Sequence, residues 1–423
     1  MKQRVVITGL GVVAPNGVGV PAFLKAIRTG KSGITFQQKL KDLNFSCQVG
    51  GVPVISEEQK LTYFTPLQLK NFHSNGVLYG VMAGMEALKD ANISPALKKD
   101  NPLWNLGIVF GVATSGVEKF REAIYKLDEG NVRRLGSTAV IQTMASGVSA
   151  YLNGMIGAGN WVTTNSAACT TGAESILMGY ERIVSGKASQ MLCGSTGEDG
   201  PYVWGGFDAI KVITYKHNEN PTEASRPLSA TASGFVPGSG AGALLLESLE
   251  SAKKRGATIY AEVLGGSLNS GGQRLDGTMT APNSAAVQKC IQDALTEAGV
   301  SGKEIDYING HLTATSKDPV EIENWSVALK RKGQDFPYIN SLKGMVGHCL
   351  AASGSIETVS TILQMHHGFV FPNVNCEDLH PEIANLIASE RVPKKEIKTT
   401  INIAAKASFG FGDVNACVIF RKK

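Results

Sequence analysis

The sequence predicts an α/β protein in which helices cover a mostly parallel sheet and two similar halves stack as α/β/α/β/α layers. Two observations indicate this class. Short runs rich in Val, Ile and Leu alternate with helical patterns along the 423 residues, and the alternation starts again near residue 250. The predicted halves are therefore 1–250 and 251–423.

In the first half, strands are expected where apolar and β-branched residues run together, and helices where apolar residues recur every three or four positions. The expected strands are 4–9, ending in a glycine turn, then 106–111, 161–164, 190–194 and the glycine-rich stretch 234–246. The expected helices are 21–28, 67–89, 117–127, 139–153, 173–184 and 247–255.

The second half shows the same two patterns in a similar order. Its expected strands are 259–265, 305–310, 337–341, 401–405 and 416–420. Its expected helices are 285–298, 320–330 and 353–366.

Several classes of function are disfavoured by composition and motifs. The net charge is +5, but the basic residues are dispersed, so nucleic acid is not an expected partner. No apolar run has the length of a membrane span, and the N-terminus lacks the shape of a secretion signal. The seven cysteines form no CxxC pair, which disfavours a metal site and favours a reducing cytoplasm. Gly9-Leu10-Gly11 lacks the third glycine of a dinucleotide site.

Cys169 lies between an expected strand and an expected helix, in the stretch Asn-Ser-Ala-Ala-Cys-Thr-Thr-Gly. Unpaired N–H groups and the helix dipole favour an anion at a helix N-terminus, so a cysteine there tends toward the nucleophilic thiolate. Small neighbours leave room for a substrate. The alternative is a buried structural cysteine, which lone cysteines usually are.

Two histidines also follow expected strands. His311 lies in Asn-Gly-His-Leu-Thr-Ala-Thr-Ser-Lys-Asp, and His348 ends Lys-Gly-Met-Val-Gly-His. Ligands of open α/β sheets bind beyond the carboxyl ends of strands. Two histidines that meet a cysteine there could activate it or stabilise charge on a substrate.

These motifs, in this order, resemble those of the β-ketoacyl-acyl-carrier-protein synthases of the thiolase superfamily, and most of all the synthase II type. The matching motifs are the cysteine stretch 167–172, the histidine loop 310–315, the Lys343-to-His348 loop, Glu357, the gating loop 408–412 and the glycine-rich stretch 233–242. The resemblance covers nearly the whole chain.

The resemblance implies a duplicated thiolase-like fold, usually a homodimer, and a decarboxylative Claisen condensation. Cys169 would take an acyl group from one acyl carrier protein, and a malonyl group on a second carrier protein would lose CO₂ and attack it. No cofactor of its own is implied, because the phosphopantetheine arrives on the carrier protein. A heterodimer with a related subunit is a further possibility.

The same resemblance implies roles for individual residues. The N–H groups of Cys169 and Phe409 would bind the oxyanion, and His311 and His348 would stabilise the enolate. Lys343 and Glu357 would orient the histidines as a buried ion pair. Thr313 and Thr315 would bind the phosphopantetheine arm, and Asp318 would brace the loop.

Some positions depart from the family pattern. Leu312 and Asp413 stand where glycine is usual, and residues 229–233 have Ser, Ala and Thr in place of charged side chains. These departures suggest a specialised synthase, such as one for aryl polyene or flexirubin-type pigments. Thr114 and Ala139 are expected to line the acyl pocket, with Ala139 in place of an aromatic residue.

Carrier-protein docking is expected to involve Arg133, Arg134 and Lys70, because such carriers are acidic. Two other readings remain. One is a non-catalytic partner subunit like the chain-length factors, which lack the cysteine. The other is a thiolase that uses coenzyme A, which has a second cysteine and one histidine, whereas this chain has histidine at both motif positions.

Overall fold

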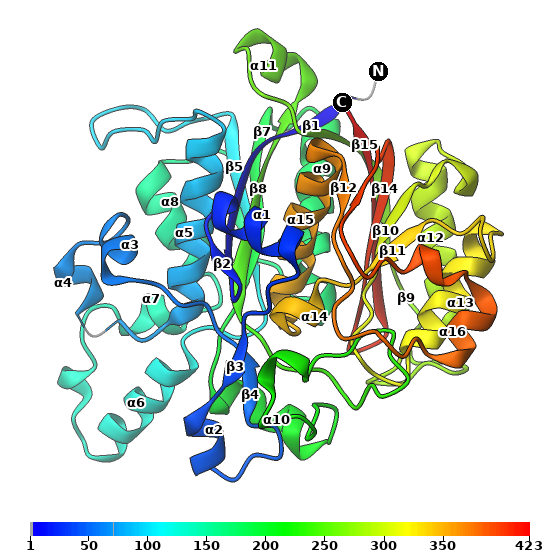
Figure 1. Ribbon diagram of the computed structural model, residues 1–423. Coiled ribbons are helices and arrows are strands. Elements are labelled where there is room, and N and C mark those ends of the chain that lie inside the picture. Colours follow the sequence, from blue (N-terminus) through cyan, green and yellow to red (C-terminus); the bar gives the residue numbers. More distant parts are fainter. Residues whose placement is uncertain (1–2, 71) are drawn as a thin grey trace.

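The computed structural model describes residues 3–70 and 72–423. Within them, one large sheet runs through the centre of the molecule, and both termini lie at the same end of it (Figure 1). The strands from the first half are β1 (Val5–Ala14), β2 (Gly17–Val18), β5 (Leu106–Val112), β6 (Val162–Thr163), β7 (Gln190–Gly197) and β8 (Gly240–Ser248). Those from the second half are β9 (Ala261–Ser270), β10 (Tyr307–Asn309), β11 (Tyr338–Asn340), β14 (Ile403–Gly410) and β15 (Val414–Lys422).

The strand order β11-β10-β14-β15-β9-β1-β8-β7-β5-β6 repeats one topology about the β9–β1 seam. Counted along the chain without β2, each half places its first strand at the seam, followed outward by its fifth, fourth, second and third. These are β1, β8, β7, β5 and β6 in the first half and β9, β15, β14, β10 and β11 in the second. The three strands farthest from the seam are parallel to one another. The fifth strand is antiparallel to both the fourth and the first, and the two first strands, β1 and β9, are antiparallel to each other. The sheet is therefore mixed, and the expected mostly parallel sheet is wrong. The division at residue 250 stays a prediction.

The helices form three layers around this sheet (Figure 1). Helices α5 (Asn75–Asp90) and α8 (Gly147–Ile156) cover the outer face of the first half, and α12 (Ser284–Ala298) and α13 (Asp318–Leu329) lie outside the second. Helices α9 (Thr171–Val184) and α15 (Ser353–His367) lie between the halves and contact strands of both. The layers are the predicted α/β/α/β/α.

The remaining elements are short or peripheral. The helices among them are α1 (Val20–Thr29), α2 (Gln38–Asp42), α3 (Glu57–Leu61), α4 (Pro66–Leu69), α6 (Val117–Asp128), α7 (Ala139–Thr143), α10 (Pro201–Ala209), α11 (Leu249–Lys254), α14 (Lys343–Val346) and α16 (Pro381–Leu386). The strands are β3 (Ile34–Phe36), β4 (Val49–Gly51), β12 (Phe369–Val370) and β13 (Ile397–Lys398).

The two central helices approach closely at their N-termini through a pair of glycines. A Cβ on Gly172 would lie 2.3 Å from the N atom of Ser355, and a Cβ on Gly354 would lie 2.6 Å from the N atom of Ala173. No side chain fits in either place. The starts of α9 and α15 are therefore held in direct backbone contact.

Two predicted helices are each interrupted. The expected helix 67–89 consists of α4 and α5, separated by a segment that includes Asn71, which lies outside the described residues. The expected helix 139–153 consists of α7 and α8, because Met144 takes an extended conformation (φ −72°, ψ 143°). The expected glycine turn after β1 is also wrong. The strand continues through Gly9 and Gly11, against which the backbone of α5 packs.

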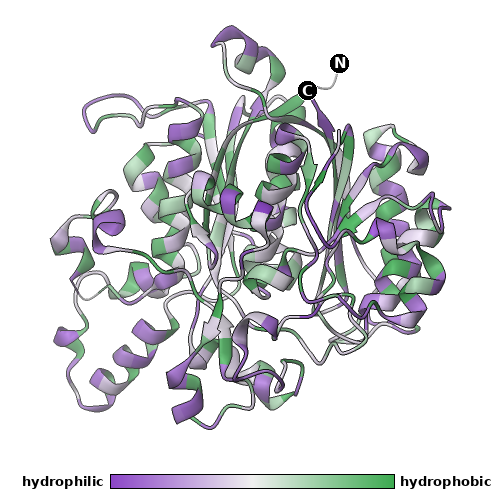
Figure 2. Ribbon diagram, viewed as in Figure 1, coloured by the Kyte–Doolittle hydropathy of each residue, from purple (hydrophilic) through white to green (hydrophobic). Residues whose placement is uncertain are grey.

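Hydropathy follows this architecture. The central strands are mainly hydrophobic, and hydrophilic residues concentrate on outlying helices (Figure 2). Helix α15 is buried along almost its whole length, as expected for a helix packed on several sides. None of the helices in the described part of the chain combines the length and the apolar character needed to cross a bilayer.

Candidate active site

Cys169 lies in a single 3₁₀ turn, Ala168–Thr170, that leads directly into α9. Ala168 has a φ of +47°, a conformation that side chains other than glycine rarely adopt. The hydroxyl of Thr171 holds this turn, because it donates to the carbonyl of Ala168 (2.7 Å) and accepts from the N–H of Ala167 (2.8 Å). The predicted place of Cys169 before a helix is confirmed.

Burial opposes the expected tendency of Cys169 toward a thiolate. Burial raises the pKa of the Cys169 thiol to about 11. The Lys343 ammonium and the backbone N–H groups of Phe411 and Cys169 act in the opposite direction, but they do not overcome the loss of solvent. Burial thus favours the thiol, whereas the nearby ammonium and N–H groups favour the anion.

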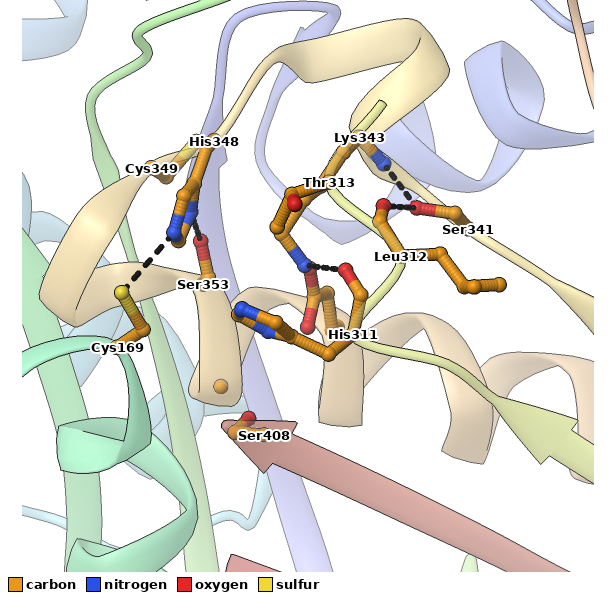
Figure 3. Close-up of polar contacts among 12 residues, drawn as sticks. Cys169, His311, Leu312, Thr313, Ser341, Lys343, His348, Cys349, Ser353 and Ser408 are labelled. Atoms are coloured by element: carbon orange, nitrogen blue, oxygen red, sulfur yellow. Dashed lines mark hydrogen bonds and ion pairs between the residues drawn. The ribbon is translucent and has the colours of Figure 1, made fainter. Parts of the chain in front are cut away.

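His348 faces Cys169, with its Nε2 atom 3.0 Å from the sulfur (Figure 3). On the other side of the ring, Nδ1 accepts the backbone N–H of Leu350 (3.3 Å) and lies 2.8 Å from the hydroxyl of Ser353. Because a backbone N–H can only donate, Nδ1 is the acceptor of the neutral ring, and the proton is on Nε2. The hydrogen bond to Cys169 is therefore donated by His348.

The glycine-rich stretch of the first half holds the loop that carries His348. The N–H of His348 donates to the carbonyl of Val236 (2.7 Å), and the N–H of Gly238 donates to the carbonyl of His348 (2.9 Å). Gly347 has a φ of +72°, and a Cβ there would lie 2.8 Å from the Val236 carbonyl oxygen. The close backbone approach explains the glycines in both segments.

His311 completes a group of three. Its ring centroid lies 5.4 Å from that of His348, at 84° between the ring planes, and 6.0 Å from that of Phe409. Burial, followed by the Lys343 ammonium, lowers the pKa of both His311 and His348 well below the usual range. Both imidazoles are therefore neutral near pH 7.

Two buried carboxyl groups shape the loop after His311. Glu321 accepts the N–H groups of His311 and Leu312, both at 2.7 Å, and burial raises its pKa to about 7. Asp318 accepts the N–H groups of Thr313 (2.9 Å) and Ala314 (3.2 Å), and burial raises its pKa to about 6. The predicted bracing by Asp318 is confirmed. Leu312, with φ +24°, is fully buried.

Lys343 and Glu357 form a buried ion pair behind the histidines. The Nζ atom of Lys343 also donates to the carbonyl of His311 (2.6 Å). A second lysine, Lys406 of β14, lies 2.9 Å from the other carboxylate oxygen of Glu357. Sequence reasoning missed Lys406 because it ended the strand at residue 405. The feature that could have revealed it is a lone lysine inside an apolar strand.

The gating loop differs from expectation in two ways. A backbone N–H group that lowers the pKa of the Cys169 thiol belongs to Phe411, two residues after the predicted Phe409, which is paired with Asn415 across the β14–β15 hairpin. Asp413, in the left-handed region (φ +62°), is fully buried. Its carboxylate accepts the N–H groups of Gln273 and Asn283, both at 2.8 Å.

A cavity of about 470 Å³ opens onto Cys169, His311 and His348. The predicted Thr313 and Thr315 line it. So do Lys211 and Lys317, which are exposed and which sequence reasoning missed.

The remaining predicted residues lie elsewhere. Thr114 lines a separate apolar cavity beside α6, and Ala139 is buried at the start of α7, outside both cavities. Arg133, Arg134 and Lys70 are exposed. The structure does not bring these five residues to Cys169.

The donor atoms of Cys169, His311 and His348 lie within 4.8 Å of one another, which would allow these described residues to hold a metal ion. Cysteine and histidine are ligands of zinc. However, the N–H of Leu350 leaves the proton of His348 on Nε2, the atom that faces the sulfur. The arrangement therefore fits hydrogen-bond donation better than coordination.

Residues 2–252 match the family model described as the β-ketoacyl synthase N-terminal domain, and residues 260–377 match the model of its C-terminal domain. The chain belongs to the β-ketoacyl synthase family. The family and fold implied by the cysteine and histidine motifs are thereby confirmed.

Curated relatives of this β-ketoacyl synthase match along almost all of it. The 3-oxoacyl-[acyl-carrier-protein] synthase II of Arabidopsis thaliana chloroplasts is 35% identical over 99% of this chain and 76% of the relative. The 3-oxoacyl-[acyl-carrier-protein] synthase 1 of Escherichia coli strain K12 is 33% identical over 99% of both chains. Proteins with these names are acyltransferases, and this chain is one as well.

Solved structures of ketosynthases have the same fold as this chain. A β-ketoacyl synthase from Burkholderia phymatum STM815 has a TM-score of 0.87 at 28% identity, and each chain is covered completely. The AntDE:AntF complex, a type II polyketide acyl carrier protein with its ketosynthase, and the ishigamide ketosynthase/chain length factor have the same TM-score, at 28% and 26% identity.

Proposed function

We propose that this β-ketoacyl synthase elongates fatty-acid or polyketide chains by condensing an acyl group on Cys169 with a malonyl group on an acyl carrier protein. The observation that carries the proposal is the meeting of Cys169, His311 and His348 in one enclosed cavity. The complete set of three also argues for a catalytic subunit over a chain-length-factor-like partner.

The reaction has three steps. The Cys169 sulfur attacks the acyl thioester, and its proton passes to the departing carrier sulfur, which is released as a thiol. The malonyl carboxylate leaves as CO₂, and the electron pair of that C–C bond passes into an enolate. The enolate carbon then attacks the Cys169 thioester, which forms the new C–C bond and frees the cysteine.

The residue roles follow from the contacts. The N–H groups of Cys169 and Phe411 point at the sulfur region and would bind the oxyanion of the thioester. His348 and His311, both neutral, would donate to the malonyl thioester oxygen, where enolate charge develops. Lys343, through its bond to the His311 carbonyl, and its partner Glu357 would position that loop.

The substrate would enter as a thioester of phosphopantetheine, with no cofactor held by this chain. The hydroxyl groups of Thr313 and Thr315 lie 3.1 Å apart in the wall of the cavity and can bind the amides of the arm. Lys211 and Lys317 line the same cavity and offer positive charge to its phosphate.

The carrier protein would dock near α6. His73 lies 3.8 Å from Glu122 of α6, which brings the segment of Lys70 to that helix, and Lys126 donates to the carbonyl of Arg134 (3.0 Å). Lys70, Arg133 and Arg134 would thus surround α6. Replacing both arginines by glutamate should raise the KM for the carrier protein, and turnover should fall with salt.

A second copy, or a related subunit, would cover the face next to this region. Among the described strands, β6 lies at the end of the sheet and pairs with β5 alone. Phe120, Ile124 and Leu127 of α6 are exposed at helical spacing, next to the apolar cavity that includes Thr114. A homodimer is the simpler of the two assemblies. The proposed location of the protein is the cytoplasm.

The acyl chain would extend toward that covered face. In this proposal Ala139 leaves room for long or rigid chains, such as aryl-capped polyenes. Ala139→Phe should shorten the longest acyl group accepted and leave short-chain condensation intact. Equal chain-length profiles in the variant and the parent would remove Ala139 from the pocket.

Mass spectrometry of the intact protein tests the central proposal. After reaction with an acyl-carrier protein, one acyl adduct is expected, and Cys169→Ala should have none. His348→Ala should still be acylated but should release little CO₂ from malonyl-carrier protein. An adduct that persists in Cys169→Ala would overturn the assignment.

A further inference from the structure

Lys406 is a fully buried lysine that the reaction described above does not use. It extends from β14, and its exposed fraction is 0%. Its Nζ atom lies 2.9 Å from Oε2 of Glu357 and donates to the hydroxyl of Ser408 (3.0 Å) and to the carbonyl of Ala407. Every partner is itself buried, so the ammonium has exchanged water for these groups.

Glu357 has two cationic partners. Lys343 contacts Oε1 and Lys406 contacts Oε2, with exposed side-chain fractions of 1% and 0%. Either lysine alone would neutralise the carboxylate. A second buried ammonium costs free energy, because the desolvation of a charge is compensated only by a full partner. With both lysines protonated, the cluster of Lys343, Glu357 and Lys406 has a formal charge of +1; burial lowers the pKa of Lys406, and the contact with Glu357 opposes that effect.

This charge lies behind the reacting groups. Lys343 donates to the backbone of His311. Burial is the main cause that lowers the pKa of His311 and His348, and the ammonium groups of Lys343 and, to a smaller extent, Lys406 act in the same direction. The other titratable groups that face the two rings are Cys169 and the carboxyl group of Glu321, which is bonded to the His311 loop. In a buried region, a fixed charge acts over several ångströms with little screening.

We infer that Lys406 is a positioning residue for the condensation, and that the positive charge it adds behind the two histidines favours the enolate. The inference rests on the proposed function. It identifies a residue, beyond the cysteine and two histidines, that sets the electrostatic potential at the point where negative charge forms.

Charge-counting variants test this inference. Lys406→Met reduces the net charge of the cluster from +1 to 0 and leaves Glu357 paired with Lys343. The double variant Lys406→Met with Glu357→Gln returns it to +1. CO₂ release from malonyl-carrier protein is measured from pH 4.5 to 9, alongside acylation of Cys169, with exposed Lys398→Met as the control.

Lys406→Met is expected to lower kcat for CO₂ release by about tenfold, with little change in KM, because one positive charge that stabilises the developing enolate is lost. The acidic limb of its pH profile should move to higher pH, since the histidines protonate more easily. The double variant should recover part of the lost kcat, and its acidic limb should move part of the way back toward that of the wild type. The inference would be overturned if the acidic limb of Lys406→Met lay at the same pH as that of the wild type. It would also be overturned if the rates of acylation and CO₂ release fell equally.

Two further measurements keep the test independent. Should Lys406→Met fail to fold, Glu357→Gln raises the net charge to +2, and NMR titration should show a lower pKa for His311 and His348. A higher pKa would overturn the inference. Wild-type protein that releases no CO₂ would contradict the proposed function, whereas the histidine titration would still report on the effect of the cluster's charge on the two histidines.

Discussion

The Nε2 atom of His348 lies 3.0 Å from the sulfur of Cys169 and carries the ring proton, so the imidazole donates to the nucleophile. In a cysteine–histidine pair built for general-base activation, the ring nitrogen would accept the thiol proton instead. Here the histidine is arranged to stabilise negative charge, first on the sulfur and then on the substrate.

The first prediction concerns the reactivity of Cys169. Because burial raises its pKa to about 11, the thiolate fraction, and with it the rate of alkylation by iodoacetamide, should rise about tenfold per pH unit from pH 7 to 10. Intact-protein mass at each pH measures the rate, and Cys169→Ser corrects for other sites. A plateau below pH 8 would show that a thiolate already exists at rest.

The second prediction concerns Ser353, which shares Nδ1 of His348 with the N–H of Leu350. Ser353→Ala should lower CO₂ release roughly threefold to tenfold, because one of the two bonds that orient the ring is lost. Acylation of Cys169 should change little. Ser360→Ala, buried on the same helix, is the control and should leave both steps intact.

The third prediction is a pH dependence of stability. Burial raises the pKa of folded Glu321 to about 7, so ionisation costs stability, and its contribution declines as pH rises from about 4.5 through 7. Glu321→Gln removes this dependence. The melting temperature of the variant, relative to wild type, should therefore increase between pH 5 and 8 in a thermal-shift series. A decrease over that range would contradict the assigned pKa.

The fourth prediction concerns Asp413, which joins the gating loop to Gln273 and Asn283. Asp413→Gly relieves the left-handed strain but removes two hydrogen bonds to a buried carboxylate. Hydrogen exchange should become faster in 271–283 and 410–414, whereas exchange in α12 beyond its first turn should not change. Asp413→Asn, which keeps one acceptor, should show an intermediate effect.

The sequence was informative where chemistry and local periodicity coincide. Cys169, His311 and His348 could be placed because each follows a strand in a motif with few alternatives. The direction in which strands pair was harder to predict from the sequence. The last strand of each half is antiparallel to its neighbours, and that arrangement depends on contacts between residues far apart in the chain. Lys406 could have been noticed as a lone lysine in an apolar strand, but its role and that of Phe411 could not have been assigned. Their roles depend on where the β14–β15 hairpin passes the helices, which no local pattern encodes.

The contact between Gly172 and Gly354 connects the chemistry of the two halves. Gly172 is three residues from Cys169, and Gly354 follows Ser353, which bonds to the ring of His348. The distance between the Cys169 sulfur and the His348 ring thus depends on two glycines, because the lack of a side chain at both positions lets the helices approach. One methyl group at residue 354 would push the helices apart and lengthen that distance. The spacing is therefore fixed before any substrate arrives.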